Sequence, residues 1–153
     1  AGVEVMAYGG YHTEVALLLR QAKAAGLELT VMGGDTMTNS ELVTAAGDAA
    51  DNVLFTFSPD ARKNPDAAPI VEKFRAAKIE PEGYVLYAYA AMQLFEQAAT
   101  AAKSTKYAAL EKAMRDGSFK TVIGELSFDA KGDQKAPGFV VYRWQGGKYD
   151  YVK

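Results

Sequence analysis

The feature that most constrains the fold is a regular alternation of short apolar runs with stretches of helical periodicity in the first third of the chain. The runs Val3–Tyr8, Leu29–Met32 and Val53–Phe57 predict three strands, the first of them buried. The segments 13–25 and 38–47 between them carry apolar residues at helical spacing. This order predicts an α/β fold in which a parallel sheet is covered by helices on both faces.

Local signals place the ends of the two helices. Gly26 stands where a left-handed residue would end the first helix. The pattern Thr38-Asn-Ser-Glu41 is typical of a capping box, in which a hydroxyl and a glutamate satisfy the first backbone N–H groups of a helix. Gly47 is expected to end that second helix. Each strand is therefore expected to lead through a short loop into its helix.

The second part of the chain follows a different pattern. A proline-rich segment, residues 58–69, interrupts the alternation and predicts a crossover between parts of the fold. Helices are expected next, one of them largely buried. Period-two patterning and a glycine pair then predict strands and a β-hairpin. The expected helices span 70–77, 84–102 and 105–115, the period-two segment spans 122–128, and the hairpin strands span 139–144 and 149–152.

Composition excludes several classes of function. The 153 residues are 49% apolar and 24% charged, which is enough apolar material for a packed core. The net charge is −2 and both signs are scattered, which argues against a nucleic-acid partner or a membrane-surface anchor. The chain has no apolar run long enough to cross a bilayer. It also has no cysteine, which excludes disulfides, thiolate metal sites and a cysteine nucleophile.

The loops after the first two strands are the strongest candidates for a binding site. Ligands of open parallel sheets bind beyond the carboxyl ends of the strands, where residues 8–12 and 33–35 are expected to lie side by side. Tyr11 could supply a flat wall and Asp35 a carboxylate, a combination suited to a ligand with an apolar body and an ammonium group. The alternative is that Asp35 is an ordinary turn residue and Tyr11 only covers the sheet edge.

Other polar groups are weaker candidates. His12 is the only histidine, so it cannot build a common zinc site, and no metal or cofactor is expected. Glu14 and Asp35 could in principle act as an acid and a base. The segment 129–133 has some features of a calcium loop but lacks the further oxygen ligands, so it is interpreted as a structural turn. A small flavodoxin-like hydrolase or lyase that uses Asp35 and His12 stays open as a rival function.

Several stretches, taken in this order, resemble one family. They are YGGYHTEVALLLRQAKAAGL, VMGGD, AGDAADNVLFTFSPDARKNP, EPEGYVLYAYAAMQ and TVIGELSFDAKGDQKAPGFVVYRW. Together they make the chain, from Val3 to Trp144, similar to the branched-chain amino-acid (Leu/Ile/Val-type) binding proteins of periplasmic ABC importers. The resemblance implies a type I periplasmic-binding fold, in which two α/β lobes close on an amino acid, and it implies a binding protein rather than an enzyme.

The resemblance also assigns ligand-binding roles. It implies that Tyr11 packs in the cleft, that Asp35 holds the ligand's ammonium group, and that Tyr84 lines the side-chain pocket. Asp35 replaces a longer glutamate that is frequent in the family, and Tyr84 adds a hydroxyl where a phenylalanine is common, so leucine-type specificity follows less directly than amino-acid binding. A receptor or regulatory domain of the same fold is the alternative.

The resemblance covers only the later part of the family fold. It implies that residues 1–58 belong to the C-terminal lobe, that residues 59–138 belong to the N-terminal lobe, and that residues 139–153 return to the C-terminal lobe. We therefore expect a partial two-lobe fragment that pairs with a complementary fragment or forms a domain-swapped homo-oligomer. The further expected partners are a small amino acid and a membrane permease, and the expected location is the periplasm.

Overall fold

A computed structural model describes residues 2–135 and 138–152, which form two compact units. Unit 1 combines the chain up to Pro59 with the chain from Gly138 onward, and unit 2 is the segment that begins at Asp60. The chain changes unit beside positions 58 and 138, where the family resemblance implies a change of lobe. Which lobe each unit belongs to stays a prediction.

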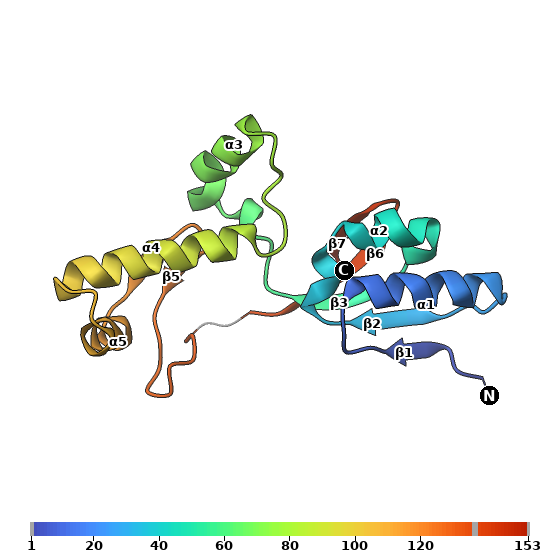
Figure 1. Ribbon diagram of the computed structural model, residues 1–153, viewed down its shortest axis with the longest axis horizontal. Coiled ribbons are helices and arrows are strands. Elements are labelled where there is room, and N and C mark those ends of the chain that lie inside the picture. Colours follow the sequence, from blue (N-terminus) through green and yellow to red (C-terminus); the bar gives the residue numbers. More distant parts are fainter. Residues whose placement is uncertain (1, 136–137, 153) are drawn as a thin grey trace. The chain divides into compact units, whose positions relative to one another are not determined.

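Unit 1 is a five-stranded sheet with helices packed on it (Figure 1). The strand order is β1-β2-β3-β6-β7, in which the first three strands are parallel and the last two pairs are antiparallel. The elements are β1 (Val5–Ala7), α1 (His12–Ala24), β2 (Thr30–Gly33), the 3₁₀ turn η1 (Asp35–Thr38), α2 (Glu41–Ala46), the 3₁₀ turn η2 (Gly47–Ala50), β3 (Leu54–Phe57), β6 (Val140–Gln145) and β7 (Lys148–Tyr151).

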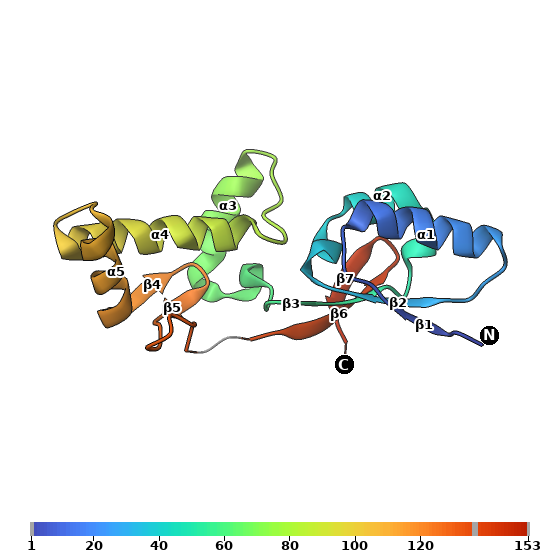
Figure 2. The same ribbon diagram turned by 60° about the horizontal axis from the view of Figure 1, so that its bottom comes forward.

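The two helices of unit 1 cover the same face of its sheet (Figures 1 and 2). Because β1, β2 and β3 follow one another across the sheet in a single direction, right-handed crossovers place both connecting helices on one side. The residues facing them are buried and include Val31, Phe55, Tyr142 and Trp144. The prediction that helices cover both faces of the sheet is therefore wrong for unit 1.

The core of unit 1 is built from aromatic rings. Phe55 of β3 stacks on Tyr142 of β6 with ring centroids 5.2 Å apart. Tyr149 of β7 meets both rings and also Trp144 edge to face. These arrangements are the favoured ones for aromatic pairs, so the β6–β7 hairpin is fastened to the parallel strands by side chains as well as by backbone pairing.

Two predictions about local structure in unit 1 are wrong. β1 is an edge strand rather than a buried one, and Val5 is 60% exposed. The capping box is also absent, because Thr38 belongs to η1 and its hydroxyl donates to the carbonyl of Asp35 over 2.9 Å. The Oδ1 of Asn39 accepts from the N–H of Glu41 instead, at the start of α2. The side chain of Asn39 thus accepts a hydrogen bond from a backbone N–H at the start of α2, a role that the sequence pattern assigns to the Thr38 hydroxyl.

Unit 2 packs three α-helices with a two-stranded hairpin. Its core cluster consists of Ala61, Ala67, Val71, Leu86, Ala90 and Val122. The elements are the 3₁₀ turns η3 (Ala61–Lys63) and η4 (Pro65–Ala67), then α3 (Ala68–Ala76), α4 (Val85–Ala102), α5 (Tyr107–Asp116), β4 (Phe119–Thr121) and β5 (Gly124–Leu126).

The structure corrects two expectations about unit 2. α4 buries only one stripe, formed by Leu86, Ala90 and Ala98, whereas the side chain of Met92 is 66% exposed. The period-two segment is not one strand, since it contains the β4–β5 turn and the short strand β5. The segment 129–133 is a turn, in which the Oδ1 of Asp129 accepts from three successive backbone N–H groups, as the structural interpretation predicts.

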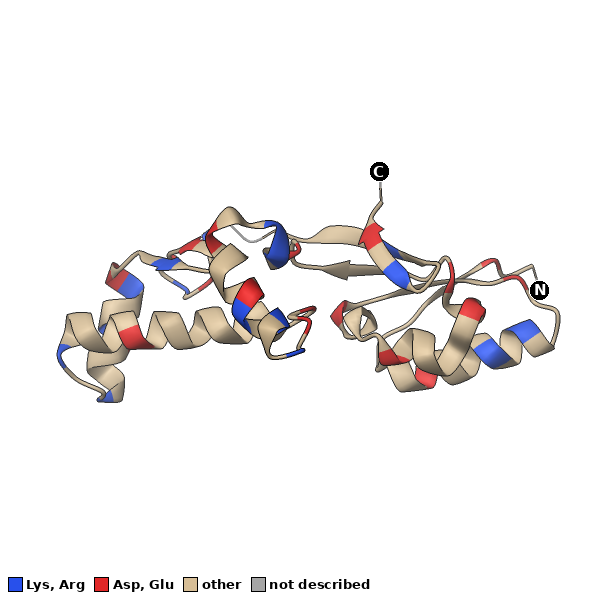
Figure 3. Cartoon of the chain, turned by 90° about the horizontal axis from the view of Figure 1, so that it is seen from above, with Lys and Arg blue, Asp and Glu red and all other residues tan. Residues whose placement is uncertain are grey.

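Charges of both signs occur in each unit (Figure 3). Within the described residues, no helix combines the length and the apolar character needed to cross a lipid bilayer. In the same residues, no three histidine, aspartate or glutamate side chains gather in a way that could hold a metal ion.

Candidate functional site

The loops that follow β1 and β2 in unit 1 lie side by side. The hydroxyl of Thr36 donates to the carbonyl of Gly10 over 2.6 Å, and the N–H of Tyr8 donates to the carbonyl of Met32 over 2.9 Å. These two bonds join the carboxyl end of β1 to that of β2. The expectation that the two loops are neighbours is thus confirmed.

Two glycines allow each of the two loops to fold back closely on itself. A Cβ on Gly10 would stand 2.7 Å from the ring of Tyr8, and a Cβ on Gly33 would stand 2.7 Å from the Cγ of Met37. Both distances are far below ordinary carbon contacts, so a larger residue at either position would force its neighbour to move. Gly33 therefore allows η1 to fold back directly over the end of β2.

Tyr11 and Asp35 are both presented to solvent by these loops. Tyr11 is the residue before α1, has an extended backbone, and is 65% exposed. Asp35 opens η1 and is also exposed. In the described part of the chain, neither the phenol of Tyr11 nor the carboxylate of Asp35 has a hydrogen-bonding or ion-pair partner. Unit 1 thus offers a flat aromatic side chain and a carboxylate on adjoining loops.

The short turn η1, which carries Asp35, is anchored to the core of unit 1. Met37 and Thr38 of η1 are buried, and the indole Nε1 of Trp144 donates to the carbonyl of Met37 over 2.7 Å. Sequence reasoning missed both Trp144 and Thr36 as supports of this site. Their partners are far away along the chain, and no local pattern indicates them.

Tyr84 belongs to unit 2. It is the residue before α4, it is 50% exposed, and its carbonyl accepts from the N–H of Ala88 over 2.8 Å. Tyr84 is therefore fixed at the first turn of a long helix. Its convergence with Tyr11 and Asp35 on one ligand stays a prediction.

Two of the three groups invoked for acid–base chemistry, His12 and Glu14, have other partners, whereas the Asp35 carboxylate has none among the described residues. The Nε2 of His12 lies 3.1 Å from the Oε2 of Glu41. The backbone N–H of Glu14 and the Thr13 hydroxyl hold the pKa of the Glu14 carboxyl below its usual range, which favours the ionised form. An ionised Glu14 cannot donate a proton, so Glu14 is not suited to act as a general acid.

Comparison with known proteins identifies the family. The family model described as "Periplasmic binding protein" matches residues 1–148. The chain belongs to this family. A relative from Brucella suis biovar 1, named "Leu/Ile/Val-binding protein homolog 1", is 48% identical over 157 residues, and the match covers 100% of this chain and 42% of the relative. An "Amino acid binding protein" from Pseudomonas aeruginosa is 40% identical over 152 residues, with 97% and 41% covered.

Solved structures of the family share the fold. A leucine binding protein from Thermotoga maritima superposes with a TM-score of 0.85 at 25% identity, covering 97% of this chain and 43% of that protein. A branched-chain amino-acid substrate binding protein from Streptococcus pneumoniae, solved in complex with isoleucine, gives 0.80 at 25% identity, with 97% and 44% covered. The type I periplasmic-binding fold is therefore confirmed. The chain spans less than half the length of these relatives, which are named as binding proteins and not as enzymes.

Proposed function

We propose that this chain is part of the solute-binding component of an ABC-type importer and binds a branched-chain amino acid in the periplasm. The observation that carries the proposal is the 48% identity to a relative named as a Leu/Ile/Val-binding protein, found along the whole chain. The presence of the exposed Asp35 and Tyr11 on adjoining loops supports it, because these groups suit an ammonium group and an apolar body.

The proposed mechanism assigns one task to each residue. The Asp35 carboxylate accepts hydrogen bonds from the ligand's ammonium group. Tyr11 covers the ligand from the same unit, and Tyr84 contacts its side chain from unit 2. Ligand favours the closed arrangement of two lobes because it touches both, and the closed form is delivered to a membrane permease. Closure would remove water around the charge pair and strengthen it.

We also propose that the chain works together with the portion of the longer protein that it does not span. The matches cover only 42% of the Brucella suis relative. Donors for the ligand's carboxylate are expected in that remaining portion. The isolated chain should therefore bind amino acids weakly, and binding should appear when the remaining portion is supplied.

Calorimetric titration tests the ligand and the role of Asp35 together. We expect the complemented chain to bind leucine and to reject 4-methylpentanoate, which keeps the side chain and carboxylate but lacks the ammonium group. Asp35→Asn keeps the shape and removes the charge, and should weaken leucine binding by ~2 to 5 kcal/mol. Glu41→Gln, a nearby exposed carboxylate on α2, is the matched control and should change little.

Two outcomes would contradict the proposal. Equal binding of leucine and 4-methylpentanoate by the wild type would show that the ammonium group is not recognised, and so that Asp35 does not bind it. If the complemented chain binds none of the standard amino acids, the ligand is not an α-amino acid of this set.

A further inference from the structure

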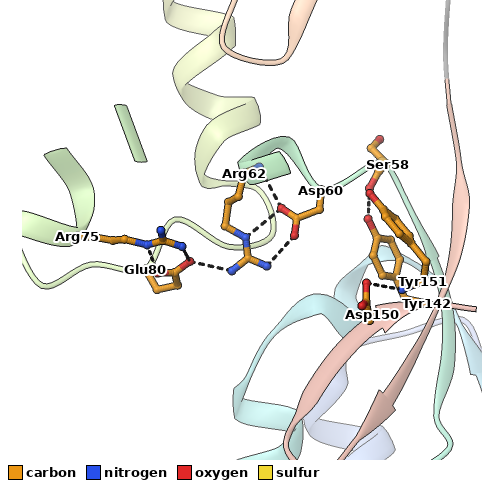
Figure 4. Close-up of polar contacts among 8 residues, drawn as sticks. All are labelled: Ser58, Asp60, Arg62, Arg75, Glu80, Tyr142, Asp150 and Tyr151. Atoms are coloured by element: carbon orange, nitrogen blue, oxygen red, sulfur yellow. Dashed lines mark hydrogen bonds and ion pairs between the residues drawn. The ribbon is translucent and has the colours of Figure 1, made fainter. Parts of the chain in front are cut away.

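Four charged side chains of unit 2 form one connected network (Figure 4). The Oδ1 of Asp60 accepts from the backbone N–H and the Nε of Arg62 at 3.0 and 2.9 Å, and its Oδ2 accepts from Nη2 at 2.9 Å. The remaining arm of Arg62, Nη1, donates to the Oε1 of Glu80 over 2.9 Å. Arg75 donates to both oxygens of Glu80, at 2.8 and 3.0 Å.

The network joins two segments that are distant along the chain. Asp60 is the first residue of unit 2, two positions after Ser58, and Glu80 lies in the loop between α3 and α4. Arg62 is the bridge, since its planar guanidinium binds Asp60 along one edge and Glu80 through the other nitrogen. Arg75, in the last turn of α3, donates only to Glu80 in this network and not to Asp60. Arg62 therefore ties the entry of unit 2 to this loop.

The bridge is better placed than an ordinary surface ion pair. The side chains of Asp60 and Arg62 are only 14% and 21% exposed. Their geometry is bidentate and therefore specific. The two guanidinium groups, that of Arg75 first, lower the pKa of Glu80 to about 2, so Glu80 is charged under ordinary conditions.

The loop held by the bridge leads directly to Tyr84. Pro81 is fully buried, and the N–H of Glu82 donates to the carbonyl of Glu80 over 2.9 Å. Gly83 has a positive φ of 55°, and the N–H of Val85 donates to the carbonyl of Glu82 over 3.2 Å. Only Pro81, Glu82 and Gly83 separate Glu80 from Tyr84, and these two hydrogen bonds hold the segment in a compact turn, so we expect a shift of Glu80 to displace Tyr84.

We infer that Arg62 is a positioning residue that holds the α3–α4 loop through Glu80, and thereby sets the place of Tyr84 against the ligand's side chain. The role of Tyr84 rests on the proposed function, whereas the hold on the loop does not. Arg62 touches no ligand in this scheme. It acts on selectivity for side-chain size, because Tyr84 is the ligand contact that it positions.

Hydrogen exchange without ligand tests the hold on the loop. Arg62→Gln should speed amide exchange in the peptide 82–88 by about fivefold or more, since local opening of the loop becomes easier. Arg75→Gln is the matched control because it also contacts Glu80 but leaves the bridge to Asp60 intact, and it should change this exchange much less. Equal effects of the two variants, or no effect of Arg62→Gln, would overturn the inference.

Ligand binding by the complemented chain tests the link to Tyr84. Arg62→Gln should weaken leucine binding by roughly fivefold to tenfold and alanine binding by less than about twofold, because alanine lacks the side chain that Tyr84 contacts. In a Tyr84→Ala background, Arg62→Gln should have little further effect on leucine binding. A full additional loss in that background would show that Arg62 acts elsewhere.

The two experiments separate the failure of this inference from the failure of the proposed function. If the wild type binds no amino acid, the proposed function fails, while the exchange experiment still decides whether Arg62 holds the loop. If the wild type binds leucine and the exchange of residues 82–88 is unchanged in Arg62→Gln, the proposed function stands and the positioning role is lost.

Discussion

Trp144 shows how a single residue can support a site that it does not touch. Its indole N–H reaches the carbonyl of Met37 inside η1, the turn whose first residue is Asp35. Trp144 and the Met37 side chain are almost completely buried, so water cannot replace the bond easily. The position of Asp35 thus depends on a hydrogen bond between two residues that lie 107 positions apart along the chain.

Replacing Trp144 with phenylalanine should destabilise unit 1 measurably. Trp144→Phe leaves the Met37 carbonyl without its donor and removes part of a buried ring, and the lost bond alone should lower the free energy of unfolding by ~1 to 3 kcal/mol. Val141→Thr changes the same strand on its exposed face and should cost less than about 0.5 kcal/mol. Urea unfolding followed by near-ultraviolet circular dichroism measures both, and equal values would contradict the anchoring role.

At the scale of elements, the β6–β7 hairpin depends on a two-residue turn. Gly146 and Gly147 have φ values of 56° and 78°, which is the left-handed region that hairpin turns of this length require. The Gly146 N–H also donates to the Oδ1 of Asp51 over 2.9 Å. The turn therefore closes the hairpin and fastens it to the segment before β3.

The turn can be tested with variants that differ only in backbone preference. Gly146→Ala should lower the free energy of unfolding by ~1 to 2 kcal/mol because alanine resists positive φ. Gly146→Asn should cost less, since asparagine tolerates that region. A Cβ at Gly146 or at Gly9 meets no atom within 4 Å, and Gly9 has no positive φ, so Gly9→Ala is the matched control. Equal costs at positions 9 and 146 in urea unfolding would contradict the backbone explanation.

Sequence patterns predicted the positions of helices and strands along the chain better than they predicted which elements pack against each other. The three parallel strands and α1 were predictable because glycines or other turn-forming residues bound their apolar or periodic runs, and Gly26 and Gly47 adopt the positive φ expected after a helix. The exposure of β1 was not predictable, because a short apolar run does not indicate its neighbours in the sheet. The pairing of Thr36 with Gly10 was equally hidden, since it joins two loops across a helix.

The uncovered face of the unit 1 sheet matters at the scale of the whole molecule. Strand register places paired residues on the same side of a sheet. Val5 pairs with Thr30, Ala7 with Met32, and Met32 with Leu54. These side chains point away from α1 and α2, and form a partly apolar surface that continues to the edge strand β1. A surface of this kind is typically covered by another segment or another chain.

We expect the portion of the longer protein that this chain does not span to cover that surface. Val5→Lys places a charge on it and should weaken association with the unmatched portion of the Brucella suis relative by at least about tenfold, because an unpaired charge is costly to bury. Leu17→Lys on α1 is the matched control, since Leu17 is 57% exposed and lies on a helix instead of the sheet. It should leave association unchanged.

Size-exclusion chromatography with light scattering measures the outcome. Wild type and Leu17→Lys should form a one-to-one complex with the supplied portion, whereas Val5→Lys should remain mostly uncombined at the same concentration. If the wild-type chain is already a dimer and Val5→Lys is a monomer, the sheet face is covered by a second copy of this chain and not by the complementary portion. Equal association of the wild type, Leu17→Lys and Val5→Lys would mean that the supplied portion does not cover this sheet face, because a lysine buried there would weaken the complex.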